Sequence, residues 1–597
     1  MSIKLDDLGE DDEKWKSTAT SLNALISRVS NRRQEIVEQW LRNHDTWKNI
    51  RSRSFYRSPT FNHSIPAARQ AIESFAIRGT QMLLPRTDYF EIQPANSFDI
   101  SSTMNAPKIL AYMDFVIRRR LRMRSICKQL LRCYQLYGRA VLKTHVKVFN
   151  SKSGKQVWPT VRAVDPFMFL VWPETAPDIE SAQMVSEDWI IPYEQYAEVA
   201  KTGGAKFIPQ DELQDATWPD HLVRRLQTTG LTDPGNETTT ASPDDKKKLT
   251  TDWAFLTEVW VNHGDHWRFC WMLNNHKDGP ILVKVSTTRF LRPDYRMTVS
   301  REIPGEHYTS SSGDDLDSLQ ILLTDQVNIS LEGQALAAAP PIAADPLTTA
   351  RWDTLVYRPR AIWRISPEGI KVIENKGDNI ARSAMQGMGM TMTLIDKYGG
   401  SSPLTSGQTM RNMPRAGFAV SSMMSMALAD IKDAVLAIED DLLTPSLGDI
   451  YQKAITYTPT TQFLRIPGAK GLNTTPKVVS DIEGDWDMLW IGSLQQQDQE
   501  ALGQRIGAIV ENVSRLPNLP AELAAKGKRI NWDYIIASWW RKSVGEREYS
   551  KIVEDIPEGE QVPLPAQPGQ SGSPSGQGQT QLPSVQELST IQGLMGR

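Results

Sequence analysis

Residues 315–342 read DLDSLQILLTDQVNISLEGQALAAAPPI, and this stretch decides the fold expected for the chain. Its apolar side chains recur at the three- and four-residue spacing of a helix that buries one stripe. The stripe consists of Leu316, Leu319, Leu323, Val327 and Leu331. Proline lacks the amide hydrogen that an α-helix needs, so Pro340-Pro341 ends the pattern. The sequence therefore predicts a helix over 315–339 with an abrupt stop.

A short β module and a returning helix follow this stop. Residues 361–365 and 369–373 read as strands around a turn at 366–368. Asp378 stands at the N-cap of a second predicted helix, which runs over 379–395. Two helices of similar length around a module too small for a core of its own predict a hairpin that projects from a larger body.

A long amphipathic helix is predicted after the break Gly399-Gly400-Ser401-Ser402-Pro403, over 418–443. At 1.5 Å per residue it would extend roughly 39 Å, and Thr444-Pro445 is expected to end it. Its inward residues are Val420, Met424, Ala427, Ile431, Val435, Ile438 and Leu442.

The N-terminal half combines helical and alternating patterns. Helices are predicted over 14–47, over 66–84 with Ser64 as N-cap and Pro66 at the first position, and over 106–137, where Gly138 ends the helix. Strands are predicted at 140–149, 157–164, 256–261, 267–273 and 281–285. The polar, breaker-rich segment 230–251 is predicted to be a surface loop.

The C-terminal part is predicted to end in a tail. A further helix after Pro445 is followed by β-like patches at 463–466 and 478–482 and by helices at 494–510 and 532–544. Residues 557–583 are rich in Pro, Gly, Ser and Gln, a composition typical of disordered segments.

Composition limits the classes of function. The 597 residues carry 67 Lys and Arg against 70 Asp and Glu, a net charge of −3, whereas a protein that grips nucleic acid over its surface is normally basic. The three cysteines, Cys127, Cys133 and Cys270, imply no disulfide framework and fit a reducing compartment. With no secretory signal and no apolar run of about 18 residues, we expect a soluble protein, intracellular at synthesis and without a membrane partner.

The motifs of the common catalytic sites are missing from the sequence. It contains no P-loop, no H-E-x-x-H, no G-x-S-x-G and no complete G-x-G-x-x-G. His263, His266 and Cys270 have ligand-like spacing, but an ordinary turn between strands is favoured over a zinc site. Asp481, Glu483, Asp485 and Asp487 alternate, which favours a solvated strand edge over a cation site. We therefore predict no catalytic residue, no metal and no cofactor.

Two further clusters leave alternatives open. Residues 118–132 hold seven cations and no anion, which favours a solvated or inter-subunit face over contact with nucleic acid. Nine of the twenty methionines lie between Met385 and Met426. Met388, Met390 and Met392 cannot all share one helix face, so a plain core and a surface that faces a shifting neighbour are equally favoured.

Four groups of segments, in this order along the chain, carry a resemblance to a known family. They are FNHSIP (61–66) with LLPRTDYFEIQP (83–94); YGRAVLK (137–143) with VDP (164–166) and DIESA (178–182); LDSLQ (316–320) with Val327-Asn328 and APPI (339–342); and TSGQTMR (405–411). In order and spacing, over roughly residues 60–555, the chain resembles the portal (head-to-tail connector) proteins of tailed double-stranded DNA bacteriophages, most like those of short-tailed phages. Pro414 and the insertion 230–251 depart from the family pattern.

The resemblance implies an α+β, mainly helical subunit of a ring of twelve. The implied parts are a wing at 1–313, stem helices at 314–339 and 378–396, a clip at 340–377, a tunnel loop at 397–417, a wing helix and β patch at 418–490, a crown at 491–556 and a disordered tail at 557–597.

The resemblance also implies a function and partners. A dodecameric ring would lie at one capsid vertex of the virion as the channel for DNA packaging and ejection, after assembly in the host cytoplasm. Its partners would be double-stranded DNA without sequence preference, the terminase large subunit, a tail adaptor protein, and the major capsid and scaffolding proteins. The implied DNA-facing residues are Lys397, Arg411 and Arg415, and the implied clip residues for partner binding are Arg351, Arg358, Arg360 and Arg364.

The charge of the chain supports this interpretation independently. A channel that lets a duplex slide must neutralise few phosphates, because each released counterion adds affinity. Three other classes compete with it: a different virion ring or adaptor protein, a DNA-processing enzyme and a nucleic-acid-binding regulator. Adaptors are much shorter than this chain, a nuclease needs clustered carboxylates, and a regulator would be basic.

Overall fold

The computed structural model describes part of the chain, and every structural statement below concerns that part. The described residues are 5, 12–50, 61–85, 90–94, 109–110, 112–151, 154–228, 248–249, 251–338, 342–344, 370–372, 377–400, 429–457 and 484–492. The chain divides into two compact units, residues 1–501 and 502–597, and all described residues belong to the first. The sequence predictions for 463–466, 478–482, 494–510, 532–544 and 557–597 lie outside the described residues.

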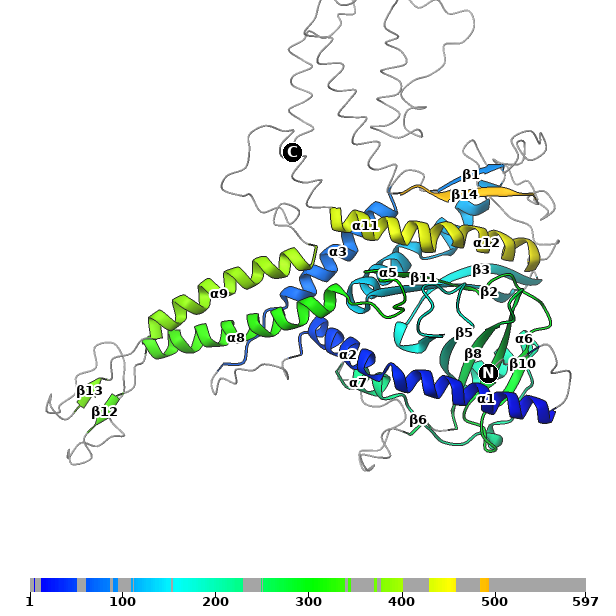
Figure 1. The fold of residues 1–597 in the computed structure, drawn as a ribbon, viewed down its shortest axis with the longest axis horizontal. Coiled ribbons are helices and arrows are strands. Elements are labelled where there is room, and N and C mark those ends of the chain that lie inside the picture. The colour runs from blue at the N-terminus through cyan, green and yellow to red at the C-terminus, as the bar shows by residue number, and fades with distance from the viewer. Residues whose placement is uncertain are drawn as a thin grey trace, which may run out of the picture. The chain divides into compact units, whose positions relative to one another are not determined.

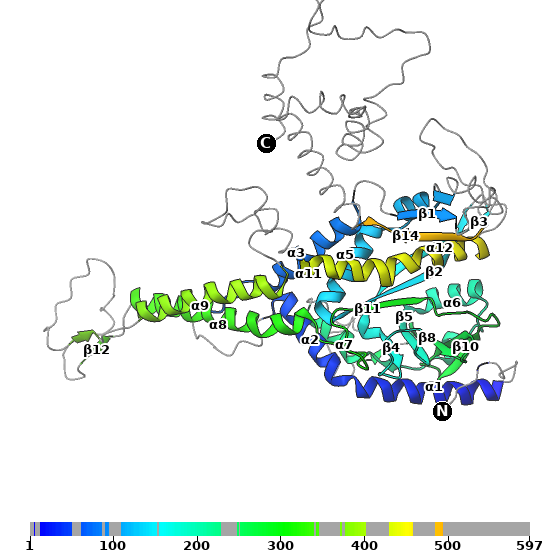
Figure 2. The same ribbon diagram turned by 45° about the horizontal axis from the view of Figure 1, so that its top comes forward.

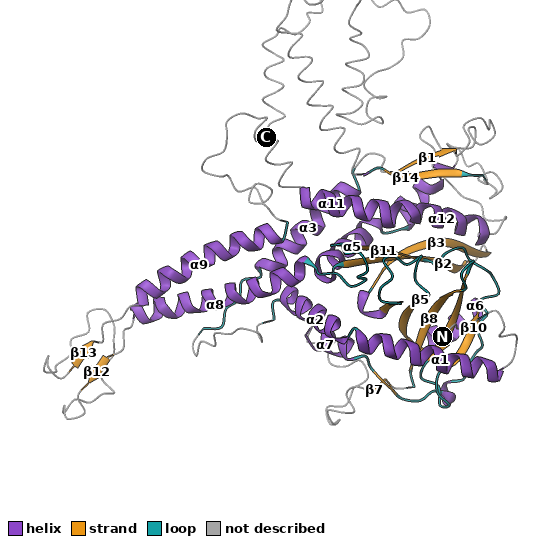
Figure 3. Cartoon of the chain, viewed as in Figure 1, coloured by secondary structure: helices purple, strands orange, loops and turns teal. Residues whose placement is uncertain are grey.

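The first unit contains both helices and sheets, which confirms the α+β class (Figures 1 and 3). Its α-helices are α1 (Asp12–Arg32), α2 (Gln34–Lys48), α3 (Ala67–Leu83), α5 (Met123–Tyr137), α6 (Tyr193–Gly203), α7 (Asp220–Thr228), α8 (Ser312–Ala338), α9 (Gly377–Tyr398), α11 (Ala429–Ile438) and α12 (Thr444–Tyr457). Two π-helical turns, Val116–Arg120 and Glu439–Leu443, interrupt or join them.

All of the strand pairs in the described part of the chain are antiparallel. A five-stranded sheet has the order β10 (Ile281–Val285), β9 (Trp267–Leu273), β8 (Trp253–Asn262), β5 (Met184–Pro192), β4 (Phe169–Trp172), and a three-stranded sheet has the order β11 (Tyr295–Val299), β2 (Arg139–Ser151), β3 (Gly154–Val164). The two-stranded pairs are β1 (Phe90–Pro94) with β14 (Trp486–Trp490), β6 (Ala216–Thr217) with β7 (Lys248–Leu249), and β12 (Ile342–Ala344) with β13 (Ile370–Val372). The five strands predicted between 140 and 285 are thereby confirmed.

Helices cover the sheets and bury their apolar faces. The apolar stripe of α1, with Leu22 and Val29, packs against Val259 and Met272 of the five-stranded sheet. Helices α5 and α12 pack against β2 and β3, and Figure 2 shows α12 running along that sheet. The core between α5, α11, α12 and β2 is the largest cluster of buried apolar residues in the described part of the chain.

The helix predicted over 14–47 is wrong in one respect: the structure divides it into α1 and α2 at Arg33. Arg33 is only 4% exposed, and its guanidinium donates hydrogen bonds to the carbonyl oxygens of Pro166, Phe167 and Phe169. The helix breaks where this side chain reaches the turn before β4. The predicted cap of α3 is also wrong: Pro66 is the N-cap, and the Ser64 hydroxyl bonds the Asn49 side chain instead.

The helix predicted over 106–137 is interrupted, which corrects that prediction. After the π-helical turn the chain becomes extended at Leu121 (φ −88°, ψ 138°), and α5 begins only at Met123. The predicted end at Gly138 is confirmed, with φ +71°. A Cβ atom at this position would lie 2.8 Å from the Thr309 carbonyl oxygen, so the close approach also requires glycine.

The stop predicted at Thr444-Pro445 is wrong. Helix α11 passes through the π-helical turn Glu439–Leu443 into α12, which continues to Tyr457. Pro445 follows the π-helical turn directly, and its missing amide hydrogen costs one backbone bond without ending the helix. The inward residues Ile431, Val435, Ile438 and Leu442 are buried as predicted, and 418–428 lie outside the described residues.

Three smaller predictions have mixed outcomes. Within the predicted loop 230–251, Lys248–Leu249 form strand β7, and most of the rest lies outside the described residues. Strand β13 confirms part of the strand predicted at 369–373, but it pairs with Ile342–Ala344, whereas 361–365 lie outside the described residues. Helices α8 and α9 confirm the helices predicted at 315–339 and 379–395, but the predicted N-cap is wrong, because α9 begins at Gly377 and Asp378 lies in its first turn.

Candidate functional site

Helices α8 and α9 form an antiparallel pair that leads away from the sheets and ends at strands β12 and β13 (Figures 1 and 2). One face of α9 is buried and consists of Ala381, Ala384, Thr391 and Ile395. These residues are three, seven and four positions apart, so they lie on the same side of the helix and form one continuous seam. Across it, the Thr391 hydroxyl donates to Gln326 Oε1 of α8 at 3.0 Å. The predicted helical hairpin is therefore present among the described residues.

Glycine lets the two helices approach closely near β12 and β13. A Cβ atom on Gly333 would lie 2.9 Å from the Gly377 carbonyl oxygen and 3.0 Å from the Ala381 amide nitrogen. Backbone atoms cannot move aside as a flexible side chain can. The interhelical distance at this end therefore depends on the absence of a side chain at Gly333.

We predict that Gly333→Val lowers the free energy of unfolding by about 2–3 kcal/mol, because the valine side chain forces α8 and α9 apart. Gly389→Ala is the matched control, since a Cβ atom at Gly389 has open space around it. Alanine favours the helix there, so this variant should gain about 0.5–1 kcal/mol. Urea denaturation of both variants measures the difference, and equal stability would contradict the close-contact argument.

Polar residues fasten the other half of α8 to the body. Gln320, Thr324 and Asn328 recur every four residues and lie on one face of the helix. Gln320 Nε2 donates to the Ile65 carbonyl at 2.7 Å, and its Oε1 accepts from the Ala68 amide at 3.0 Å. Asn328 Oδ1 accepts from the His63 amide at 2.9 Å. This buried polar face sets the direction in which the hairpin leaves the body.

Of the predicted DNA-facing residues, only Lys397 lies in the described part of the chain. It is exposed in the last turn of α9 and lines a cavity of about 350 Å³ together with Tyr398, Asp430 and Asp433. The other predicted site residues, Arg411, Arg415, Arg351, Arg358, Arg360 and Arg364, lie outside the described residues. The structure therefore does not test whether the predicted DNA-facing and clip residues lie close together.

Two glycines position the chain immediately after Lys397. A Cβ atom on Gly399 would lie 2.5 Å from the Ala71 Cβ of α3, and Gly400 has φ +66° beside the Phe75 ring. Because neither position accepts a side chain without strain, α9 ends directly against α3. The chain thus enters residues 401–428 from a fixed point beside the cavity.

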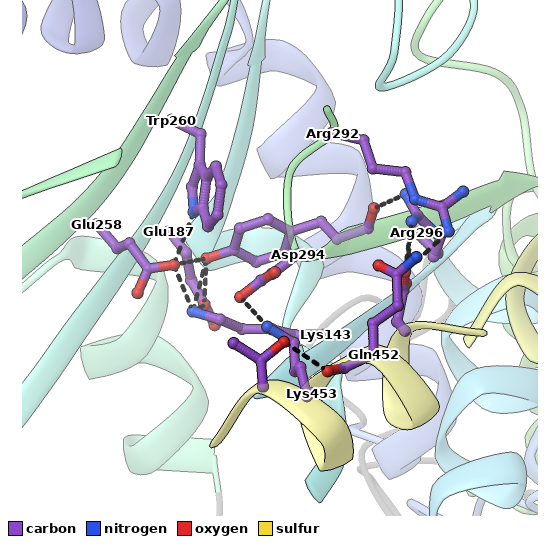
Figure 4. A network of polar contacts seen from close by, with 12 residues as sticks. Lys143, Glu187, Glu258, Trp260, Arg292, Asp294, Arg296, Gln452 and Lys453 are labelled. Atoms are coloured by element: carbon purple, nitrogen blue, oxygen red, sulfur yellow. Dashed lines mark hydrogen bonds and ion pairs between the residues drawn. The ribbon is translucent and has the colours of Figure 1, made fainter. Parts of the chain in front are cut away.

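A buried charged network, which the sequence analysis missed, joins the two large sheets (Figure 4). Lys143 of β2 is 2% exposed, and its ammonium donates to Glu258 Oε1 at 2.7 Å, Tyr295 Oη at 2.9 Å and Glu187 Oε2 at 3.2 Å. Arg162 of β3 adds a two-pronged contact to Glu187 at 2.6 and 2.7 Å. These contacts therefore fix the position of the three-stranded sheet relative to the five-stranded sheet.

The electrostatics of this network are those of a structural clamp. Burial alone would raise the pKa of Glu187, but the charges of Lys143 and Arg162 outweigh it and hold that pKa at about 2. Burial and the two nearby carboxylates raise the pKa of Tyr295 well above its ordinary value. All three ammonium hydrogens of Lys143 are taken by network members, so the group has none left for a substrate.

A second set of ion pairs fixes α12 to β11 and to the loop before it (Figure 4). Asp449 of α12 bonds Arg292 at 2.9 Å and Arg296 at 2.9 Å, and Lys453 bonds Asp294 at 2.8 Å. Arg296 and Asp449 are nearly buried, which strengthens their pairing relative to exposed ion pairs. Through α12 and the π-helical turn, α11 is therefore anchored to the sheet beneath it.

The structure places most of the remaining sequence candidates. His263 and His266 lie in the turn between β8 and β9, which confirms the favoured turn, and Cys270 is buried in the sheet, where burial raises its pKa to about 12. Asp485 precedes β14 and Asp487 lies within it, whereas 481–483 lie outside the described residues. Within the described ranges, no three His, Cys, Asp or Glu side chains gather as metal ligands would.

The methionines of α9 divide as their spacing requires. Met388 packs against the core that contains Leu316 and Leu323 of α8, whereas Met390 and Met392 are 71% and 40% exposed. Core packing therefore accounts for Met388, whereas Met390 and Met392 lie on the surface of this chain.

No protein-family model matches this chain, and no curated protein matches it. Searching the helices of the described part for a membrane-spanning segment finds none that is sufficiently long and apolar.

Proposed function

We propose that this chain is a phage portal protein, a subunit of a dodecameric ring through which double-stranded DNA is packaged and ejected. The observation that carries the proposal is the α8–α9 hairpin, which has a short strand pair between its helices and leaves an α+β body. Together with the order of sequence segments described above, this arrangement supports a stem, a clip and a wing.

The surroundings of Lys397 support a channel that holds DNA weakly. In a symmetric ring each exposed cation recurs once per subunit, and each phosphate that it neutralises adds sequence-independent affinity. Lys397 shares its cavity with Asp430 and Asp433, which offset its charge. A duplex would therefore meet a ring of weak contacts and could slide past them.

The partners follow from the proposed parts. The clip, 340–377 with Arg351, Arg358, Arg360 and Arg364, would bind the terminase large subunit during packaging and a tail adaptor afterwards. The wing and crown would face the major capsid and scaffolding proteins at the capsid vertex. Rotationally averaged electron micrographs of the purified protein test the ring itself, and a monodisperse monomer would reject the proposal.

We predict that the double variant Lys397→Ala, Arg411→Ala forms intact rings but packages or retains less DNA than the parent. The two changes remove cations that contact the passing duplex and leave the hairpin seam untouched. Packaged DNA per particle, measured by nuclease protection, is the readout. Lys147→Ala, an exposed change on β2, is the control. Unaltered packaging in rings of normal appearance would remove the DNA-facing role of these residues.

A further inference from the structure

An exposed basic face lies at the start of α5. It consists of Arg119, Arg122 and Arg124, which are exposed and have no ion pair with any described residue. Their neighbours are already engaged: Arg118 pairs with Asp114, and the Arg120 guanidinium lies 4.5 Å from the centre of the Trp158 ring. The π-helical turn Val116–Arg120 and the extended Leu121 present these cations at the surface.

The position of the basic face is unfavourable for the isolated chain. The N-terminus of a helix carries positive partial charge, so cations there are destabilising and anions stabilising. Helix α5 has no acidic residue in its first turn, and its N-cap, Arg122, makes no side-chain capping bond. An anionic surface supplied from outside would remove this repulsion.

An acidic face of similar size lies on α11 and the π-helical turn that follows it. It consists of Asp430, Asp433 and Asp440, all exposed and without an ion pair to a described residue. Burial raises the pKa of Tyr134 to about 12, and the nearby charges of Asp433 and Asp441 add to this shift. Lys397 lines the same cavity as Asp430 and Asp433 and offsets their negative charge in part, and Arg301 is engaged by Asp315.

Two members of the acidic face lie at the opposite end of α5 from the basic face. Asp430 and Asp433 line the same cavity as Tyr134 and Gln135 near the end of the helix, whereas the basic face lies at its start. The 15 residues of α5 span about 22 Å, more than twice the Debye length at physiological salt. Within one copy, Asp430 and Asp433 are therefore too far from the basic face to neutralise it.

We propose that the basic face of one copy binds the acidic face of the next copy. This inference rests on the proposed ring and names the charged surfaces that join its subunits. A contact between two different faces is head-to-tail, and such contacts close into a ring when the rotation between copies permits. Nucleic acid is the less favoured partner, because the chain itself supplies an acidic face matching the three arginines and carries a net charge of −3.

The test is a charge-reversal exchange. Variant one carries R119E, R122E and R124E, and variant two carries D430K, D433K and D440K. Each alone presents like charges at both faces, so the concentration needed for assembly should rise on the order of a hundredfold. Mixed in equal amounts, the two should assemble again, because alternating copies restore every opposite-charge contact. Mass photometry at about 150 mM salt measures assembly, and circular dichroism checks that each variant is folded.

The possible outcomes separate this inference from the function on which it rests. A wild-type chain that stays monomeric rejects the ring, and the inference with it. Wild-type rings with both variants still assembling alone, or a mixture that fails to assemble from folded variants, would overturn the pairing and leave the ring in place. If variant one keeps its ring but loses binding to a fluorescent DNA duplex, the basic face belongs to nucleic acid, and the pairing is overturned.

Discussion

Replacing Lys143 by methionine is expected to lower the free energy of unfolding by about 3–5 kcal/mol at neutral pH. Methionine matches the length of the lysine stem, so the loss comes from the charge and not from a cavity. Glu187 and Glu258 would remain buried on neighbouring strands, where they face each other in register. Directly opposed like charges destabilise a sheet, and removal of the cation between them exposes that repulsion.

The pH dependence of this loss has a definite sign. In the wild type the pKa of Glu187 is lowered from 4.5 to about 2, so its contribution is present above pH 4.5 and is lost as the pH falls toward 2. The pKa of Glu258 is also lowered, since Lys143 outweighs the effect of burial. Without Lys143, burial and Glu187 both raise the pKa of Glu258. As the pH falls, protonation of Glu258 then removes its repulsion with Glu187 in the variant. The loss in free energy of unfolding caused by Lys143→Met should therefore be smaller at pH 5 than at pH 7.

Lys147→Met is the matched control, because Lys147 lies four residues further along β2 and is exposed. Its effect should stay within about 0.5 kcal/mol, as is usual for surface changes. Urea denaturation followed by tryptophan fluorescence measures both variants, since Trp260 and Trp271 donate hydrogen bonds to Glu258. Similar losses for the two lysines, or a deficit for Lys143→Met that grows with acid, would contradict the proposed network.

Local signals were sufficient to predict the hairpin. The stripe of α8 and the Pro340-Pro341 stop act within one or two helical turns, and α8 and α9 formed close to the predicted bounds, although Asp378 lies inside α9 and is not its N-cap. Long-range contacts accompany two breaks in the other helices. Arg33 bonds carbonyls more than 130 residues away, and at the second break Arg120 lies over the ring of Trp158 in strand β3. Spacing within a window of residues cannot detect such contacts.

The charged network could not be predicted for a related reason. Lys143 and its partners Glu187 and Glu258 are separated by 44 and 115 residues, and only the register of β5 against β8 brings the two carboxylates together. A lysine within the apolar run of β2 was the one available signal. Lys397, in contrast, came from family resemblance, and the structure supplied its acidic neighbours on α11.

Replacing Arg33 by alanine is expected to lower the free energy of unfolding by about 2–4 kcal/mol, because hydrogen bonds to a charged group contribute about 1.5–3 kcal/mol each and are not additive. The guanidinium donates to Pro166, Phe167 and Phe169, whose carbonyl oxygens lose these donors in the variant. Arg33 also stands between α1 and α2, so the variant removes the contact that fixes the break between the two helices.

The neighbouring residue provides an internal control for this prediction. Arg32 is 60% exposed and approaches Glu174 at 3.6 Å, so Arg32→Ala should cost no more than about 0.5–1 kcal/mol. Hydrogen exchange at the α1–α2 junction adds a local readout, because loss of the carbonyl contacts should speed exchange there before the sheets unfold. Equal stability of the two variants would show that α1 and α2 are separated by some cause other than the buried guanidinium.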